Sequence, residues 1–138
     1  MSQAGKKARY MVIAAAALIS ARPSPTLADI YVIINPSLTI AADDIKLIYT
    51  GDKELAGATK IKPLDNHAAA GEFLSKVLLL TAGRYESLWI KKSFRDGLIP
   101  PAVKATDDEV IAYVQSTPGA IGYVMSAPPS GVVVLKKF

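Results

Sequence analysis

The sequence predicts an α/β sandwich with a largely parallel sheet, because strand patterns and helix patterns alternate along the chain. Residues 30–34 (IYVII) form a continuous apolar run rich in β-branched side chains, which is typical of a strand buried on both faces of a parallel sheet. Residues 106–124 contain a helix start, a helix stop and a second strand in close succession. These two stretches anchor the predicted fold.

The N-terminal segment, residues 1–28, has the features of a secretory signal peptide. Three cations precede an apolar run at residues 11–19, and residues 26–28 (TLA) offer a small-residue cleavage site. The run is shorter than the roughly 20 residues that a membrane span requires, and the alternative is an uncleaved anchor helix. We expect residues 29–138 to form one periplasmic domain that has no membrane contact once the signal is removed.

The basic character of the chain comes from that segment. The chain holds 16 Lys and Arg against 12 Asp and Glu, and four of the cations but none of the acids fall in residues 1–28. The predicted domain therefore carries twelve charges of each sign and lacks the basic excess that nucleic-acid binding requires. The absence of cysteine excludes disulfides, thiol nucleophiles and thiolate metal sites.

The first half of the predicted domain holds two further helices and a strand. Residues 42–49 place apolar side chains on one helical face, and Gly51 is positioned to close this helix in a left-handed cap. Residues 59–64 (TKIKPL) alternate as a strand, in which Pro63 marks a strand end or an edge. Residues 68–80 carry a helical apolar stripe.

The next predicted helix covers residues 84–94, with Trp89 facing inward. Three cations gather near its end: Lys91, Lys92 and Arg95. We interpret them as a solvated helix end, where cations favour the carbonyl pole, and an anion or partner patch is the alternative. Residues 97–102 (GLIPPA) are an extended connector, because adjacent prolines forbid a helix.

The last part of the chain gives the clearest local signals. Thr106 and Glu109 form a capping box, which predicts a helix beginning at Asp107. Residues 118–119 (PG) end that helix, residues 120–124 (AIGYV) read as a strand, and residues 132–135 read as the final one.

Several motifs together resemble the periplasmic solute-binding proteins of the phosphate ABC transporter type. They are residues 41–51 (AADDIKLIYTG), 61–65 (IKPLD), Trp89, 93–101 (SFRDGLIPP) and 117–123 (TPGAIGY), in the family's order. The resemblance covers most of residues 29–138. It implies a single three-layer α/β/α lobe with a type II periplasmic-binding-protein-like fold, whereas transport receptors have two lobes that close over a solute.

Two loops are candidates for ligand binding, because helix N-termini at the carboxyl ends of strands present unpaired amides to anions. The first loop contributes Asn35, Ser37 and Thr39, and the second contributes Asn66, His67 and Ala68. The resemblance implies a Ser-Gly-Thr type cradle at the second loop, where this chain reads NHAAAG. The alternative is that Asn66 is a helix cap, His67 a surface side chain, and Ser37 and Thr39 ordinary loop residues.

The sequence shows no arrangement that indicates catalysis or a cofactor. One histidine and scattered carboxylates do not make a metal site, and no nucleophile or P-loop motif occurs. We therefore expect a non-enzymatic, exported solute-binding-like domain that binds a small anion such as phosphate, as an accessory to ABC-type phosphate uptake. The alternative is a periplasmic interaction or adaptor module, with a protein partner or as a homodimer, that kept the fold and lost the ligand.

Overall fold

A computed structural model describes residues 28–138. The predicted signal peptide therefore lies outside the described residues, apart from Ala28. The elements, in chain order, are β1 (Tyr31–Ile34), α2 (Asp44–Tyr49), β2 (Leu55–Ala56), β3 (Thr59–Lys60), β4 (Lys62–Asn66), α3 (Ala70–Phe73), η2 (Leu74–Leu78, a turn of π-helix), α4 (Ala82–Asp96), β5 (Ala102–Lys104), α5 (Asp107–Ser116), β6 (Ala120–Val124) and β7 (Val133–Lys137).

Within the described residues, five strands form one sheet in the order β5-β4-β6-β1-β7. Strand β4 is parallel to β5 and to β6, whereas β1 is antiparallel to both of its neighbours, β6 and β7. Four of the five strands therefore run in one direction, which confirms the α/β class with a largely parallel sheet. The expectation that residues 30–34 form a parallel strand is wrong, because β1 is the one reversed strand.

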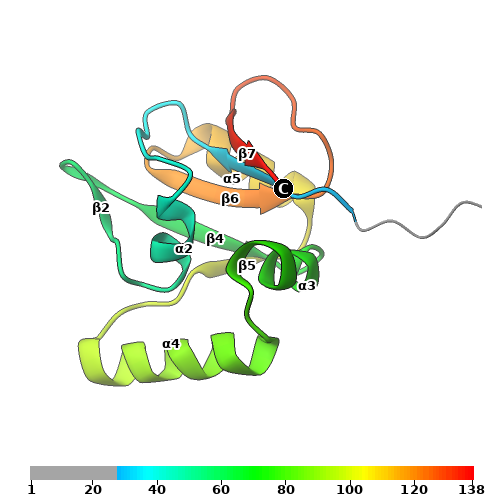
Figure 1. Cartoon of the computed structure of the whole chain (residues 1–138). Helices are drawn as coiled ribbons and strands as arrows, with labels where there is room; N and C mark the ends of the chain where they lie inside the picture. The colour runs from blue at the N-terminus through cyan, green and yellow to red at the C-terminus, as the bar shows by residue number, and fades with distance from the viewer. Residues whose placement is uncertain (1–27) are drawn as a thin grey trace, which may run out of the picture.

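Helices cover both faces of this sheet (Figure 1). Alternation along β6 explains the two layers, since successive side chains of a strand point to opposite faces. Ile121 and Tyr123 pack with α2, α3 and η2, while Ala120 and Val124 pack with α5. The three-layer arrangement expected from the sequence is thus present.

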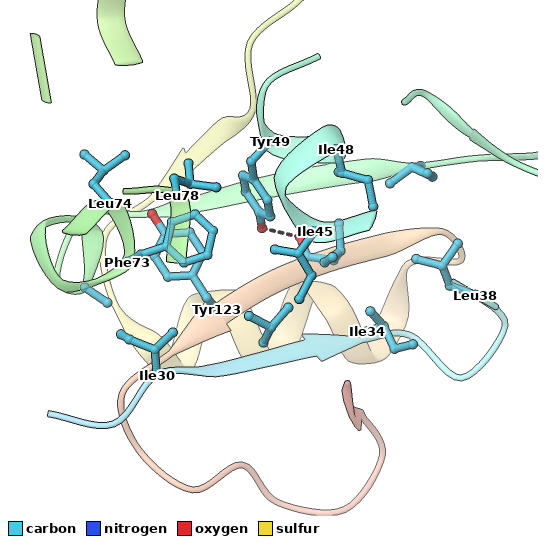
Figure 2. Packing of buried hydrophobic residues seen from close by; sticks show 14 residues of the cluster. Ile30, Ile34, Leu38, Ile45, Ile48, Tyr49, Phe73, Leu74, Leu78 and Tyr123 are labelled. Carbon is cyan, nitrogen blue, oxygen red and sulfur yellow. Dashed lines mark hydrogen bonds between the residues drawn. The ribbon is translucent and has the colours of Figure 1, made fainter. Parts of the chain in front are cut away.

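The larger core layer is built around three aromatic rings (Figure 2). Phe73 stacks on Tyr123 with ring centroids 3.7 Å apart, and Tyr49 meets Phe73 edge-on at 4.8 Å. The Tyr49 hydroxyl donates to the carbonyl oxygen of Leu64 at 2.8 Å, so its polar end is satisfied inside the core. Because Tyr49 lies in α2, Phe73 in α3 and Tyr123 in β6, these contacts pack α2 and α3 against the sheet.

Close helix-to-sheet packing explains why Gly122 occupies the centre of β6. A Cβ atom at this position would lie 2.5 Å from Cγ1 of Val110, which real Cβ atoms essentially never approach. The glycine therefore lets α5 lie directly against β6.

Some element boundaries differ from the sequence-based predictions. The strand expected at residues 59–64 is divided, because β3 pairs with β2 in a small hairpin while β4 joins the main sheet. Pro63 pairs only with β6, since the pairing of β4 with β5 begins at Leu64. The helix expected over residues 68–80 begins later and ends at Leu78, because Leu79 adopts a left-handed conformation with φ of 57°.

Helix α4 lies outside the main layers (Figure 1). The contacts that attach it to the body include hydrogen bonds from the Trp89 indole to the Tyr49 carbonyl at 3.0 Å and from the Tyr85 hydroxyl to Asp65 at 2.9 Å. Trp89 is buried as predicted, whereas Ile90 and Phe94 are exposed. Helix α4 thus leaves apolar side chains at the surface.

Candidate functional site

The two loops predicted to bind a ligand follow β1 and β4, and they lie at opposite ends of the strands, one beside the start of β6 and the other beside its end. Ile34, at the end of β1, is opposite Ile121 near the start of β6, and the Asn35 amide donates to the Ala120 carbonyl at 3.0 Å. Asn66 instead contacts the Tyr123 carbonyl, three residues further along β6, which corresponds to ~10 Å of strand. Because β1 is antiparallel, the structure does not bring the two loops together.

The loop after β1 is tied to the end of α5. The Asn35 side-chain amide donates to the carbonyl of Val114 at 2.8 Å, and its oxygen accepts from the Ser37 amide at 2.9 Å. The Ser37 hydroxyl accepts from the Gly119 amide at 3.3 Å, and Thr39 is exposed. Asn35 therefore joins the ends of three segments, which is a structural use of its hydrogen-bonding groups.

The loop after β4 also uses its donors internally. The His67 amide donates to the Lys104 carbonyl at 2.8 Å, and the Ala68 amide donates to the Asn66 side-chain oxygen at 3.1 Å. Asn66 is fully buried, whereas the His67 and Ala68 side chains are exposed. Asn66 does not cap the following helix, since Ala69 takes that position without a side-chain cap bond.

A residue that the sequence analysis did not place in the site occupies its centre. One carboxylate oxygen of Asp107 accepts from the Asn66 side-chain amide at 2.7 Å. The other oxygen accepts from the Met125 amide at 3.1 Å, the Ser126 amide at 3.1 Å and the Ser126 hydroxyl at 3.0 Å. We call this arrangement of Asn66, Asp107, Met125 and Ser126 the carboxyl-edge cradle.

The sequence indicated two members of this cradle, Asn66 as a candidate binding residue and Asp107 as the start of a helix, but not that they meet. The capping box predicts that Asp107 is the first residue of its helix, where a carboxylate complements the positive pole. That role holds, since Asp107 is the first residue of α5, and Thr106 caps the helix by accepting from the Glu109 amide at 3.3 Å. The parallel order of β4 and β6 was needed to show that residues 66 and 125–126 meet this carboxylate.

The cradle can hold a negatively charged oxygen pair. Two backbone amides, one side-chain amide and one hydroxyl converge from the carboxyl ends of two parallel strands, and such donors bind carboxylates and phosphates alike. In this structure they bind a carboxylate that belongs to the chain itself.

A second polar group lies deeper, where β4 meets α4. Asp65 accepts from the Tyr123 hydroxyl at 2.8 Å and from the Tyr85 hydroxyl at 2.9 Å. Burial raises the pKa of Asp65 above its ordinary value, and the two hydrogen bonds act in the opposite direction. Burial and then the nearby Asp65 charge raise the pKa of both tyrosines, so they remain hydroxyl donors.

The cations predicted near the end of α4 lie at the surface. Lys92 forms an ion pair with Asp52, and Arg95 forms one with Asp96 at 3.1 Å. The hydrogen bond from Lys92 lowers the pKa of Asp52. Ion pairs at the surface of a protein contribute little to its stability, because solvent screens them.

Within residues 28–138, no helix is long and apolar enough to cross a membrane, and no three His, Asp or Glu side chains lie together in a way that could hold a metal ion.

No family model matches the sequence, and no curated protein matches it significantly. The structure is similar to a phosphate ABC transporter substrate-binding protein with bound phosphate from Clostridium perfringens, with a TM-score of 0.57 and 19% identity over 80% of this chain. An ABC-type phosphate transport receptor from Vibrio cholerae (TM-score 0.49, 14% identity, 80% of this chain) and PstS from Borrelia burgdorferi (TM-score 0.46, 18% identity, 70% of this chain) also match. The chain spans 46%, 47% and 41% of these three proteins, respectively.

The described residues therefore have a type II periplasmic-binding-protein-like fold. More specifically, they have the fold found in substrate-binding proteins of the phosphate ABC transporter type, and they correspond to about half of such a protein. The resemblance noted in the sequence is confirmed for the fold. The Clostridium perfringens protein that shares this fold is a substrate-binding protein.

Proposed function

We propose that this chain is an exported, non-enzymatic module with the fold of one phosphate-receptor lobe, which acts by contacting a second protein surface rather than by enclosing a solute alone. The observation that carries the proposal is the internal use of the donors at the carboxyl edge. The amides of His67 and Ala68 and the donors of the cradle already have acceptors within the chain. A ligand would have to displace the Asp107 carboxylate from these donors, and the hydrogen bonds that Asp107 makes would be lost.

Paired surface variants test this proposal. Ala68→Arg places a bulky charge at the carboxyl edge, and Thr39→Arg places the same group on the exposed loop at the opposite end of the strands. We expect the protein to self-associate in sedimentation velocity, or to purify with one periplasmic protein, and Ala68→Arg but not Thr39→Arg to abolish that association. A wild-type protein that remains monomeric at high concentration and purifies alone would contradict it.

Export is the other part of the proposal. It is supported by the composition of residues 1–28. Mass spectrometry of the mature protein should give an N-terminus near Asp29, and an intact N-terminus on the purified protein would contradict cleavage.

A second candidate function is direct binding of a small anion such as phosphate, as an accessory to ABC-type phosphate uptake. The observation that favours it is the cradle, whose donors suit any oxyanion of carboxylate or phosphate type. We propose that only the loop with Asn66, His67 and Ala68 takes part in this binding. The loop with Asn35, Ser37 and Thr39 lies at the opposite end of the strands.

Thermal unfolding with phosphate, sulfate, molybdate and formate separates the two functions. If the chain binds the anion directly, an anion concentration ten times the Kd should stabilise the wild-type protein by about 1.4 kcal/mol. The interaction module predicts no such shift for the wild type. It also predicts a shift for Asp107→Ala, in which the cradle has lost its own carboxylate, and none for the matched variant Asp108→Ala.

A further inference from the structure

A cavity of about 610 Å³ lies between α4 and the β4–β5 edge of the sheet. Asp65 from β4 lines it, together with Tyr85, Glu86 and Trp89 from α4, and the exposed side chains of Ile90 and Phe94 are also part of its wall. Most of the remaining wall is apolar. A mostly apolar cavity of this size with a few polar groups is typical of a small-molecule site.

The polar group of this cavity is a buried carboxylate with neutral partners. Asp65 is 9% exposed, and both of its hydrogen-bond donors are tyrosine hydroxyls. Among the ion pairs within residues 28–138, none includes Asp65. Burial of a carboxylate without a cation is unfavourable, because the charge loses its hydration. A cation bound beside it would offset part of this desolvation free energy.

The charges on the two sides of α4 differ in sign. A second cavity of about 710 Å³ on the other side is lined by Arg84, Lys91, Lys92 and Arg95. By contrast, the described residues that line the Asp65 cavity include two acids, Asp65 and Glu86, and no lysine or arginine. The Asp65 cavity therefore combines acids with aromatic rings.

We propose that the Asp65 cavity binds a small organic cation, namely an ammonium group carried on an apolar body. The ammonium group would lie toward Asp65, and the aromatic rings of Tyr85 and Trp89, which also line the cavity, would add cation–π attraction through their faces. The apolar body would occupy the wall that Ile90 and Phe94 complete. This site is distinct from the carboxyl-edge cradle and does not depend on whether that cradle binds an anion.

Trp89 is the only tryptophan of the chain, so its fluorescence reports on the cavity directly. The probes are 2-phenylethylamine, its neutral isostere 2-phenylethanol and the anion 3-phenylpropionate. We expect a saturable fluorescence change with 2-phenylethylamine at a Kd at least about ten-fold lower than with either other probe, which corresponds to about 1.4 kcal/mol. Equal Kd values for the three probes, or no saturable change with the amine, would overturn the proposal.

Three variants test the role of the charges. Asp65→Asn should reduce the preference for the amine over the alcohol to about one, and Ser87→Ala on the other side of α4 should leave it unchanged. If Asp65→Asn does not fold, Ile90→Lys provides the same test from an exposed position, since it adds a cation to the wall. Ile90→Lys should weaken amine binding by about ten-fold, and an unchanged amine Kd in this variant would overturn the proposal.

Discussion

Asn66, the last residue of β4, donates its side-chain amide to the carboxylate of Asp107, the first residue of α5, at 2.7 Å. This hydrogen bond joins residues 41 positions apart, and the backbone amides of Met125 and Ser126 donate to the other oxygen of the same carboxylate.

Removal of the Asp107 carboxylate should lower the stability of the fold. Asp107→Ala leaves two backbone amides and one N–H of the buried Asn66 side chain without an acceptor, while the other Asn66 N–H still donates to the Tyr123 carbonyl. We expect the free energy of unfolding to fall by about 2–3 kcal/mol in urea denaturation. Asp108→Ala changes an exposed acid in the same turn and should cost less than about 0.5 kcal/mol. Equal losses in the two variants would show that the hydrogen bonds to Asp107 do not stabilise the fold.

Gly122 should tolerate no side chain while Val110 is present. Gly122→Ala brings a methyl group to 2.5 Å from Val110, and we expect a loss of about 1–3 kcal/mol in the free energy of unfolding. Gly83→Ala is the matched control, because that position lies in α4 with open space around it and should be neutral or slightly stabilising. The loss caused by Gly122→Ala should shrink in a Val110→Ala background, and strictly additive effects would argue against this contact.

Asn35 should matter for stability rather than for ligand binding. Asn35→Ala removes a donor to the Val114 carbonyl and an acceptor for the Ser37 amide, and the buried carbonyl is left unpaired. We expect a loss of about 1–3 kcal/mol in chemical denaturation, while Thr39→Ala, at an exposed position of the same loop, should have no measurable effect. An Asn35→Ala protein of full stability that loses affinity for an anion would reverse this assignment.

The buried Asp65 should give the fold a characteristic pH dependence. Its pKa is raised by burial, so the folded protein holds this proton more tightly than the unfolded chain does. The carboxyl group therefore contributes less stability as the pH rises from its ordinary value of 3.8 through the raised pKa, and the loss is complete above it. The difference in unfolding free energy between wild type and Asp65→Asn should fall with pH across that window. A difference that increases with pH there would mean that the tyrosine hydrogen bonds outweigh burial.

Local signals in the sequence were sufficient for most elements. The capping box at Thr106 gave the first residue of α5, and the left-handed cap predicted at Gly51 is present, with φ of 80°. The strands predicted at residues 30–34 and 120–124 are confirmed as β1 and β6. In each case residues close in sequence determine the type of element.

Features that depend on distant pairing were missed. The direction of β1 is set by its neighbours β6 and β7, and an apolar strand pattern does not encode direction. The short strand β5 follows two prolines and pairs with β4 through only three residues, so residues 102–104 showed no strand pattern of their own. The cradle was missed for the same reason, since Asn66, Asp107 and Ser126 meet only in the folded sheet.

The donors of the carboxyl-edge cradle are occupied by the carboxylate of Asp107. The most direct test is an NMR titration of the isotope-labelled protein with phosphate, which follows the amide signals of Ala68, Met125 and Ser126. With phosphate we expect no saturable change in these signals for the wild-type protein. For Asp107→Ala we expect a saturable change in the signals of Met125 and Ser126. Saturable shifts of these amides in the wild-type protein would contradict it.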